Sequence, residues 1–140
     1  VYMTSNYILF FDGCSKGNPG ESGAGAVIFR DDKEIYTESF FVGDRETNNV
    51  AEYTGLIMGL SYAVDNNMDT LVVKGDSNLV IRQMKGEFQV KSPKLMPYYQ
   101  EARKLSDKIK NIRYEHVYRD NNKRADELAN NALLLKISEK

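Results

Sequence analysis

Two apolar, strand-like runs that lie far apart in the chain each lead into an aspartate. The first, Tyr7–Phe11, is followed by Asp12, and the second, Thr70–Gly75, is followed by Asp76. In an open α/β sheet, ligands bind beyond the carboxyl ends of the strands. Neighbouring strands would bring these two carboxylates close together, and their repulsion then requires a shared proton or a divalent cation. The chain therefore points to a metal site made of oxygen ligands.

The rest of the chain predicts an α/β domain with the element order βββαβααβα. Gly55 and Gly59 would each cost a helix about 1 kcal/mol relative to alanine, so their spacing suggests a close approach between that helix and the sheet. Long crossovers give a mixed sheet with helices on its faces. After a turn over residues 13–23, we expect strands at 25–30 and 34–42. A helix capped by Asn48 or Asn49 should run to about Asn66, followed by a strand at 70–76. The remaining expected elements are helices at 77–84 and from Ser92-Pro93 to about 109, a strand at 111–118, and a helix capped by Asn121 or Asn122.

Composition and length indicate one ordinary globular domain over residues 1–140. Apolar residues make up 41% of the chain and charged residues 28%, and no apolar run approaches the roughly 20 residues needed to cross a bilayer. Residues 1–6 carry no secretory signal, and we expect them to be disordered or foreign to the natural chain.

The single cysteine, Cys14, excludes an internal disulfide and fits a reducing compartment, so we expect a cytoplasmic protein. The net charge of −1 argues neither for nor against nucleic acid, because cations would neutralise part of an acidic site.

Two further acids, Glu52 and Asp126, fall in the first turns of predicted helices. Each of the four acids has a simpler explanation alone: a helix dipole favours an acid in its first turn, and an aspartate often opens a turn or caps a helix. The inference therefore rests on the convergence of all four on one rim of the sheet. Four carboxylates without a histidine or cysteine cluster suit Mg²⁺ or Mn²⁺ and fit zinc poorly. Two such ions about 4 Å apart can activate water and stabilise a leaving alkoxide during phosphodiester cleavage.

Four segments taken together closely resemble type 1 ribonuclease H. They are Asp12-Gly13 with Gly17-Asn18-Pro19-Gly20, then residues 47–52 (TNNVAE), 75–77 (GDS) and 124–129 (RADELA). They span nearly the whole chain in the family's order. The resemblance implies the ribonuclease H-like fold, a five-stranded mixed sheet in the order 3-2-1-4-5 with strand 2 antiparallel and helices on both faces.

The resemblance also implies endonucleolytic cleavage of the RNA strand of RNA–DNA hybrids with two Mg²⁺ or Mn²⁺ ions, leaving 5′-phosphate and 3′-hydroxyl ends. Asp12, Glu52, Asp76 and Asp126 would be the catalytic, metal-binding carboxylates. Asp12 would bridge both ions, and Asp126 would help to hold the ion that activates water.

The same resemblance places the substrate contacts. Telling RNA from DNA requires groups that read the 2′-hydroxyl, and side-chain amides suit that task because they both donate and accept hydrogen bonds. One asparagine of the pair at 48–49 is also expected to cap the helix. The implied contacts are Gly13, Ser15, Asn18, Asn48, Asn49 and Asn78 for the RNA strand, and Arg45 and Thr47 for a phosphate of the DNA strand. The basic protrusion of some relatives is absent from the sequence, and Lys85, Lys91 and Lys94 are candidates for further contacts with DNA phosphates.

The loop before the last acid departs from many members of the family. Residues 119–123 are short and lack a histidine, which resembles the short-loop, archaeal-type branch in which an arginine occupies this region. Arg119 is therefore a candidate auxiliary residue for the scissile phosphate or for product release. A guanidinium cannot shuttle protons near neutral pH. The single histidine, His116, lies inside a predicted strand and is expected to be a structural imidazole.

Two alternatives stay open. One is a related nuclease of the polynucleotidyl-transferase superfamily that also cuts double-stranded RNA, and the other is a non-catalytic module that binds hybrids. The asparagine pair and the glycine-rich turn argue against a nuclease of DNA alone, and the presence of all four acids argues against the module. We expect a monomer with no membrane partner.

Overall fold

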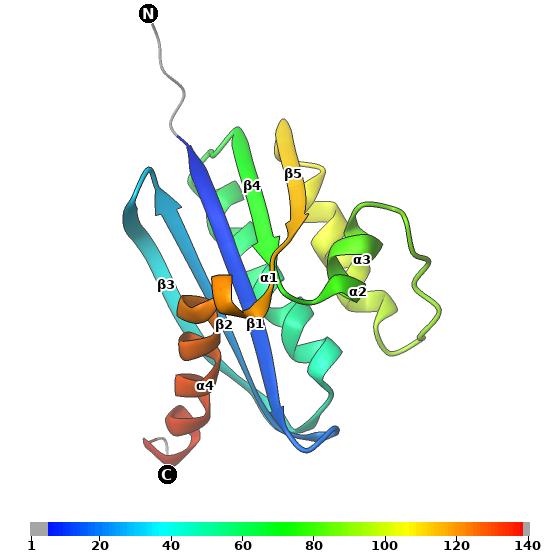
Figure 1. The fold of residues 1–140 in the computed structure, drawn as a ribbon. Helices are drawn as coiled ribbons and strands as arrows, with labels where there is room; N and C mark the ends of the chain where they lie inside the picture. Colours follow the sequence, from blue (N-terminus) through cyan, green and yellow to red (C-terminus); the bar gives the residue numbers. More distant parts are fainter. Residues whose placement is uncertain (1–5, 139–140) are drawn as a thin grey trace, which may run out of the picture.

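Five strands form one mixed sheet in the order β3-β2-β1-β4-β5 (Figure 1). The strand β2 runs antiparallel to both of its neighbours, whereas β1, β4 and β5 are parallel to one another. The predicted α/β class, strand order and antiparallel second strand are confirmed. The strands are β1 (Tyr7–Lys16), β2 (Gly20–Arg30), β3 (Lys33–Glu46), β4 (Thr70–Gly75) and β5 (Asn111–His116).

The computed structural model describes residues 6–138. Residues 1–5, most of the segment predicted to be disordered or foreign, lie outside the described residues. Asn6, which was included in that segment, takes part in the fold, because its carbonyl oxygen accepts a hydrogen bond from the Asp31 N–H at 3.0 Å. Within residues 6–138, no helix combines the length and the apolar character that crossing a membrane requires.

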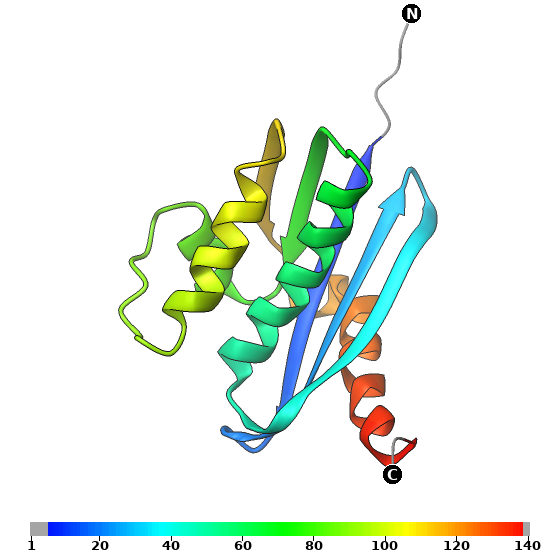
Figure 2. The same cartoon turned by 180° about the vertical axis from the view of Figure 1, so that it is seen from behind.

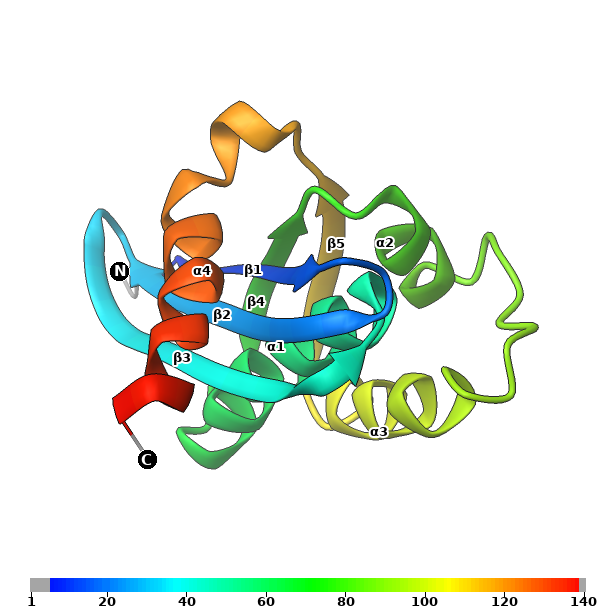
Figure 3. The same cartoon turned by 90° about the horizontal axis from the view of Figure 1, so that it is seen from below.

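Helices cover both faces of the sheet, as predicted. Figure 2 shows α1 and α3 in front of the sheet and α4 behind it, and Figure 3 shows the same two layers along the sheet. A short 3-10 turn, η1 (Arg119–Asn121), leads from β5 to α4. The helices are α1 (Asn48–Asp65), α2 (Asn78–Met84), α3 (Met96–Ser106) and α4 (Lys123–Ser138).

Each helical layer packs on its own apolar core. The larger core lies between the sheet and α1–α3, and it contains the face of α1 on which Tyr53, Leu56, Leu60 and Ala63 recur at helical spacing. The smaller core joins α4 to the opposite face of the sheet through Val27, Ala125 and Leu128. Among the largest fully buried side chains are Tyr53, Phe11, Leu9, Leu56 and Leu60.

Two glycines allow α1 to approach β1 closely. A Cβ atom on Gly55 would lie 2.7 Å from the carbonyl oxygen of Asp12, and one on Gly59 would overlap the side chain of Leu9. The predicted close approach is thus confirmed. It brings the second turn of α1, which carries Glu52, beside the strand that carries Asp12. The sequence predicted Glu52 one turn earlier, because it placed the cap at Asn48 or Asn49.

The β1–β2 hairpin is longer than the sequence predicted. The expected turn over residues 13–23 shrinks to residues 17–19, because antiparallel pairing continues past the first acid and places Asp12 opposite Gly25. Gly17 provides the φ of 95° that this turn uses. Asp12 therefore lies within β1 instead of at its end. It still faces Asp76, because the parallel pairing of β1 with β4 stops at Phe11 and Gly75.

Two helices begin at other residues than predicted. Thr47, and not an asparagine of the following pair, caps α1, since its Oγ1 accepts a hydrogen bond from the Val50 N–H at 3.2 Å. The helix α3 begins at Met96, because the chain first makes a separate turn in which the Ser92 Oγ accepts from the Leu95 N–H at 3.3 Å. Serine and threonine at these positions satisfy backbone donors that would otherwise lack a partner.

The side chain of Asn122 ties the start of α4 to β1. One of Asn121 and Asn122 was predicted to cap this helix, and Asn122 does occupy the position directly before Lys123, the first residue of α4. Its Nδ2 donates to the carbonyl oxygen of Phe11 at 3.0 Å. Its own carbonyl oxygen accepts from the Asp126 N–H at 3.0 Å. The first turn of α4, which carries Asp126, is therefore anchored next to the residue that precedes Asp12.

Candidate active site

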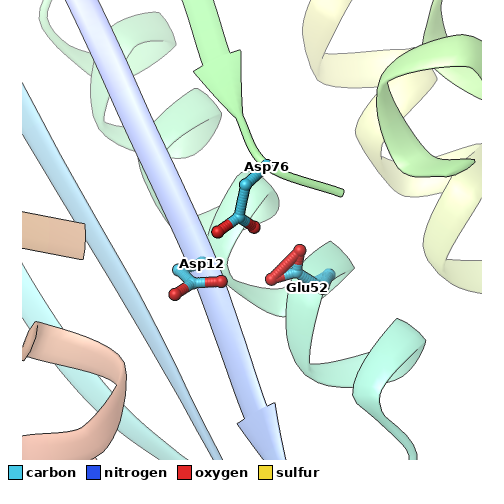
Figure 4. A group of neighbouring side chains, drawn as sticks. All are labelled: Asp12, Glu52 and Asp76. Atoms are coloured by element: carbon cyan, nitrogen blue, oxygen red, sulfur yellow. The ribbon is translucent and has the colours of Figure 1, made fainter. Parts of the chain in front are cut away.

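Three carboxylates from three different elements meet at one edge of the parallel strands. Asp12 comes from β1, Glu52 from the second turn of α1, and Asp76 from the residue after β4 (Figure 4). One carboxylate oxygen of each lies within 4.8 Å of the others. Asp12 and Glu52 are each only 5% exposed. The sequence-based expectation that distant acids converge here is met for these three.

Burial strongly alters the electrostatics of this group. It is the main cause that raises the pKa of Asp12 to about 7, with Asp76 and Asp126 adding to the rise and hydrogen bonds from Glu52 and Gly13 opposing it. Burial also raises the pKa of Glu52 well above its ordinary value, and Asp12 raises it further. Near neutral pH the pair therefore favours a retained proton, unless a cation takes its place.

The backbone N–H of Gly13 links the two buried carboxylates. It donates to Asp12 Oδ1 at 2.9 Å and to Glu52 Oε1 at 2.5 Å. A Cβ atom on Gly13 would overlap the backbone of Ala51 and Glu52, so only glycine fits between the strand and the helix here. This contact fixes the separation of the two acids before any ligand binds.

Asp126 faces the same cleft without joining the group of three. The cleft has a volume of about 600 Å³, and Asp126 lines it from the first turn of α4. Asn130, one helical turn further, donates to the carbonyl oxygen of Asp126 at 2.9 Å and to its Oδ1 at 3.2 Å. The fourth acid is thus oriented by its own helix and stands on the rim of the cleft.

The predicted substrate residues divide between the cleft, a second hollow and the open surface. Gly13, Ser15, Asn48, Asn49 and Arg119 line the cleft. The second hollow, of about 240 Å³, is lined by Asn18, Thr47 and Asn49 together with Ser92, Lys94 and Leu95, so it meets the cleft at Asn49. Arg45, Asn78 and Lys91 line neither.

Several of these polar side chains are already engaged within the fold. The Ser15 Oγ donates to the Glu46 carbonyl oxygen at 3.0 Å, which joins β1 to the end of β3. The Oδ1 of Asn18 accepts from the Asn48 N–H at 3.0 Å. These contacts hold the glycine-rich turn against the start of α1, so both present a fixed surface to the cleft.

His116 lies in β5, as predicted, and is its last residue, and a structural role for its imidazole stays a prediction. Its side chain is exposed and lines the cleft, and its Nε2 lies 3.3 Å from the carbonyl oxygen of Asp76. The physical reason is its register position: it pairs across the ladder with Gly75, which has no side chain to cover it. The sequence reasoning also missed Tyr118, Lys16 and Asn130 as lining residues. The aligned ends of β4 and β5 were the signal that could have found His116.

Comparisons with known proteins agree with this geometry. Residues 10–132 match the family described as reverse transcriptase-like. The crystal structure of RNase H1 from the halophilic archaeon Halobacterium salinarum superposes with a TM-score of 0.86 at 37% identity, covering 91% of this chain and 97% of that one. The chain belongs to the ribonuclease H family. The haloarchaeal relative agrees with the predicted archaeal-type branch.

Two further proteins are similar to this chain over most of its length. The bifunctional protein Rv2228c of Mycobacterium tuberculosis is 46% identical over 127 residues, which are 90% of this chain and 35% of that protein. The LC11-RNase H1 structure, solved in complex with an RNA/DNA hybrid, has a TM-score of 0.86 at 32% identity and covers 94% of this chain and 99% of that one. The chain spans about a third of the length of the mycobacterial relative.

Proposed function

We propose that this chain is a metal-dependent endonuclease that hydrolyses the RNA strand of RNA–DNA hybrids and leaves 5′-phosphate and 3′-hydroxyl ends. The observation that carries the proposal is the convergence of Asp12, Glu52 and Asp76, with Asp126 on the rim of the same cleft. The hybrid bound in the LC11-RNase H1 structure supports the choice of substrate. All four acids are present, so we favour an enzyme over a module that only binds hybrids.

The donor set fits two Mg²⁺ or Mn²⁺ ions. It offers carboxylate oxygens only, which hard divalent cations prefer. Burial of Asp12 and Glu52 makes their joint ionisation unfavourable, and bound cations would relieve that penalty. When bound, the ions would activate a water molecule and neutralise the charge that develops on the leaving oxygen.

The carboxylates of this chain would hold the metal ions, and neighbouring groups would orient the carboxylates. Asp12, Glu52 and Asp76 would hold the ions, and the Gly13 N–H keeps the first two at a fixed separation. Asp126 would complete the set from the rim, where Asn130 orients it. Preorganised charges of this kind lower a barrier because they need not rearrange during the reaction.

The two hollows suggest how a duplex would lie. Gly13, Ser15, Asn48 and Asn49 would read the RNA strand at the cleft, and Asn49 connects them to the hollow at Thr47. That hollow contains Lys94 and suits a phosphate of the DNA strand. Asn18 and Arg45 would support these contacts, and Asn78 and Lys91 would extend them along the surface. Arg119, in the cleft, would grip a phosphate and not move a proton.

Two simpler observations support a proposal for the oligomeric state and the cellular compartment. The cleft is formed within one chain, which fits a monomer. Cys14 is a half-buried free thiol, which fits a reducing compartment such as the cytoplasm.

A gel assay with three labelled duplexes tests the proposal. The duplexes are an RNA–DNA hybrid, double-stranded RNA and double-stranded DNA, each incubated with Mg²⁺, with Mn²⁺ and with EDTA. We expect cleavage of the RNA strand of the hybrid with either metal and none with EDTA. Comparable cleavage of double-stranded RNA would favour the broader nuclease, binding without cleavage would favour the module, and cleavage in EDTA would contradict the metal mechanism.

A further inference from the structure

Tyr118 presents an exposed aromatic ring at the rim of the acidic cleft. It is 77% exposed, more than any other large apolar or aromatic residue among residues 6–136. It nevertheless lines the same cleft as Asp76 and Asp126. A single exposed ring is ordinary on a protein surface, but this one stands in the lining of a ligand site.

The ring stands on a fixed backbone. On one side of Tyr118, the Val117 N–H donates to the Gly75 carbonyl oxygen at 2.9 Å, which continues the pairing of β5 with β4. On the other side, the Asn121 N–H donates to the Tyr118 carbonyl oxygen at 2.8 Å and opens η1. Figure 1 shows this connection passing from the end of β5 across β1. The residue is therefore held at the cleft by its two flanking elements.

The neighbouring imidazole sets the orientation of the ring. The rings of His116 and Tyr118 meet edge to face, with centroids 5.3 Å apart and an interplanar angle of 79°. His116 in turn lies against the carbonyl of Asp76, at 3.3 Å from its oxygen. Edge-to-face pairs of this kind favour one ring orientation over others. The Tyr118 ring is thus preorganised beside one of the candidate metal ligands.

The chemistry of the cleft explains why an uncharged contact is useful there. Four carboxylates repel the phosphates of a nucleic acid wherever cations do not shield them. An aromatic ring can instead pack against a ribose, which a duplex exposes in its shallow minor groove, and such packing does not depend on charge. Arg119 and Lys16 are the cations that line the cleft within the described residues, so an aromatic residue would add a second kind of contact.

We propose that Tyr118 contacts the substrate by packing its ring on a ribose of the RNA strand next to the bond that is cut. This inference rests on the proposed function. Phe88 is less suited to the task, because it is 44% exposed, already packs against Arg82 at 5.3 Å and lies outside the cleft lining. Phe40, 49% exposed on β3 and likewise outside the cleft, provides a matched control.

The test compares Tyr118→Ala, Tyr118→Phe and Phe40→Ala. KM and kcat are measured on an RNA–DNA hybrid, and Kd for the same hybrid is measured by fluorescence anisotropy in an Asp12→Asn background. We expect Tyr118→Ala to raise KM and Kd on the order of tenfold, which corresponds to about 1.4 kcal/mol of lost packing, with a much smaller change in kcat. Tyr118→Phe should retain the parent values, and Phe40→Ala should not change them.

The outcomes separate this inference from the proposed function. If the parent chain cleaves the hybrid and Tyr118→Ala binds it as well as Phe40→Ala does, the role of Tyr118 is overturned while the function stands. If the parent chain neither binds nor cleaves the hybrid, both fail. Thermal melting checks the fold of each variant. Should Tyr118→Ala melt early, Tyr118→Leu keeps the volume without the aromatic face, and unchanged binding by that variant would equally overturn the inference.

Discussion

Replacing Asp12 with asparagine should stabilise the metal-free protein while it abolishes cleavage. Asp12 is 5% exposed, and burial raises its pKa from 3.8 to about 7. A pKa that is higher in the folded state means that the fold favours the protonated carboxyl. This group therefore contributes most to stability below its unfolded pKa of about 4, and that contribution is lost as the pH rises towards about 7. Asparagine keeps the shape and carries no charge to desolvate.

The magnitude follows from the same shift. A change from 3.8 to about 7 is roughly three pKa units, which corresponds to about 4 kcal/mol once the carboxyl is fully ionised. Glu52 titrates with it, so part of the penalty is shared, and we expect about 1–3 kcal/mol for the substitution. In a domain of this size that corresponds to a rise in Tm of about 3–10 °C near pH 8 and little change near pH 4.

Thermal melting by circular dichroism in EDTA measures this effect at both pH values. Asp32→Asn, on the exposed turn between β2 and β3, is the matched control and should change stability by no more than about 0.5 kcal/mol. An Asp12→Asn variant that melts no higher than the parent near pH 8 would refute the electrostatic account. So would a gain of equal size near pH 4, since the carboxyl is then already protonated.

Three further predictions follow from the same geometry. Mg²⁺ should raise the Tm of the parent chain near pH 8 by several degrees and should have little effect on Asp12→Asn, as differential scanning fluorimetry would show. Gly25→Ala should destabilise the protein by about 1–3 kcal/mol in urea unfolding, because a Cβ there would lie 2.5 Å from the Ala129 nitrogen and push α4 off β2. Asn130→Ala should lower kcat by about 3- to 10-fold with KM and Tm nearly unchanged, because Asp126 loses the amide that orients it; unchanged kcat in steady-state assays would contradict this role.

Local patterns predicted the elements and three of the acids well, for identifiable reasons. Apolar periodicity marked the buried face of α1, and the Gly55 and Gly59 spacing marked its approach to β1. Asp12 and Asp76 were found because the apolar runs before them are parallel neighbours in the sheet. In these cases the residues that predict a structural feature lie within a few positions of that feature in the sequence.

The features that sequence reasoning missed depend on long-range register or on choices between similar residues. Thr47 and the two asparagines after it are all good helix caps, so composition alone could not select Thr47. The glycine-rich segment after Asp12 has the composition of a turn, yet pairing with β2 keeps most of it extended. His116 reached the cleft because β5 pairs with β4 in a register that places it opposite Gly75.

The most direct test of the central claim is anomalous diffraction from a crystal soaked in Mn²⁺. Three buried or half-buried carboxylates that meet within 4.8 Å should hold at least one ion. The account predicts an anomalous peak in contact with Asp12, Glu52 and Asp76 that disappears in Asp12→Asn crystals. Mn²⁺ found only elsewhere on the protein, in a chain that still cleaves hybrids with Mn²⁺, would contradict it.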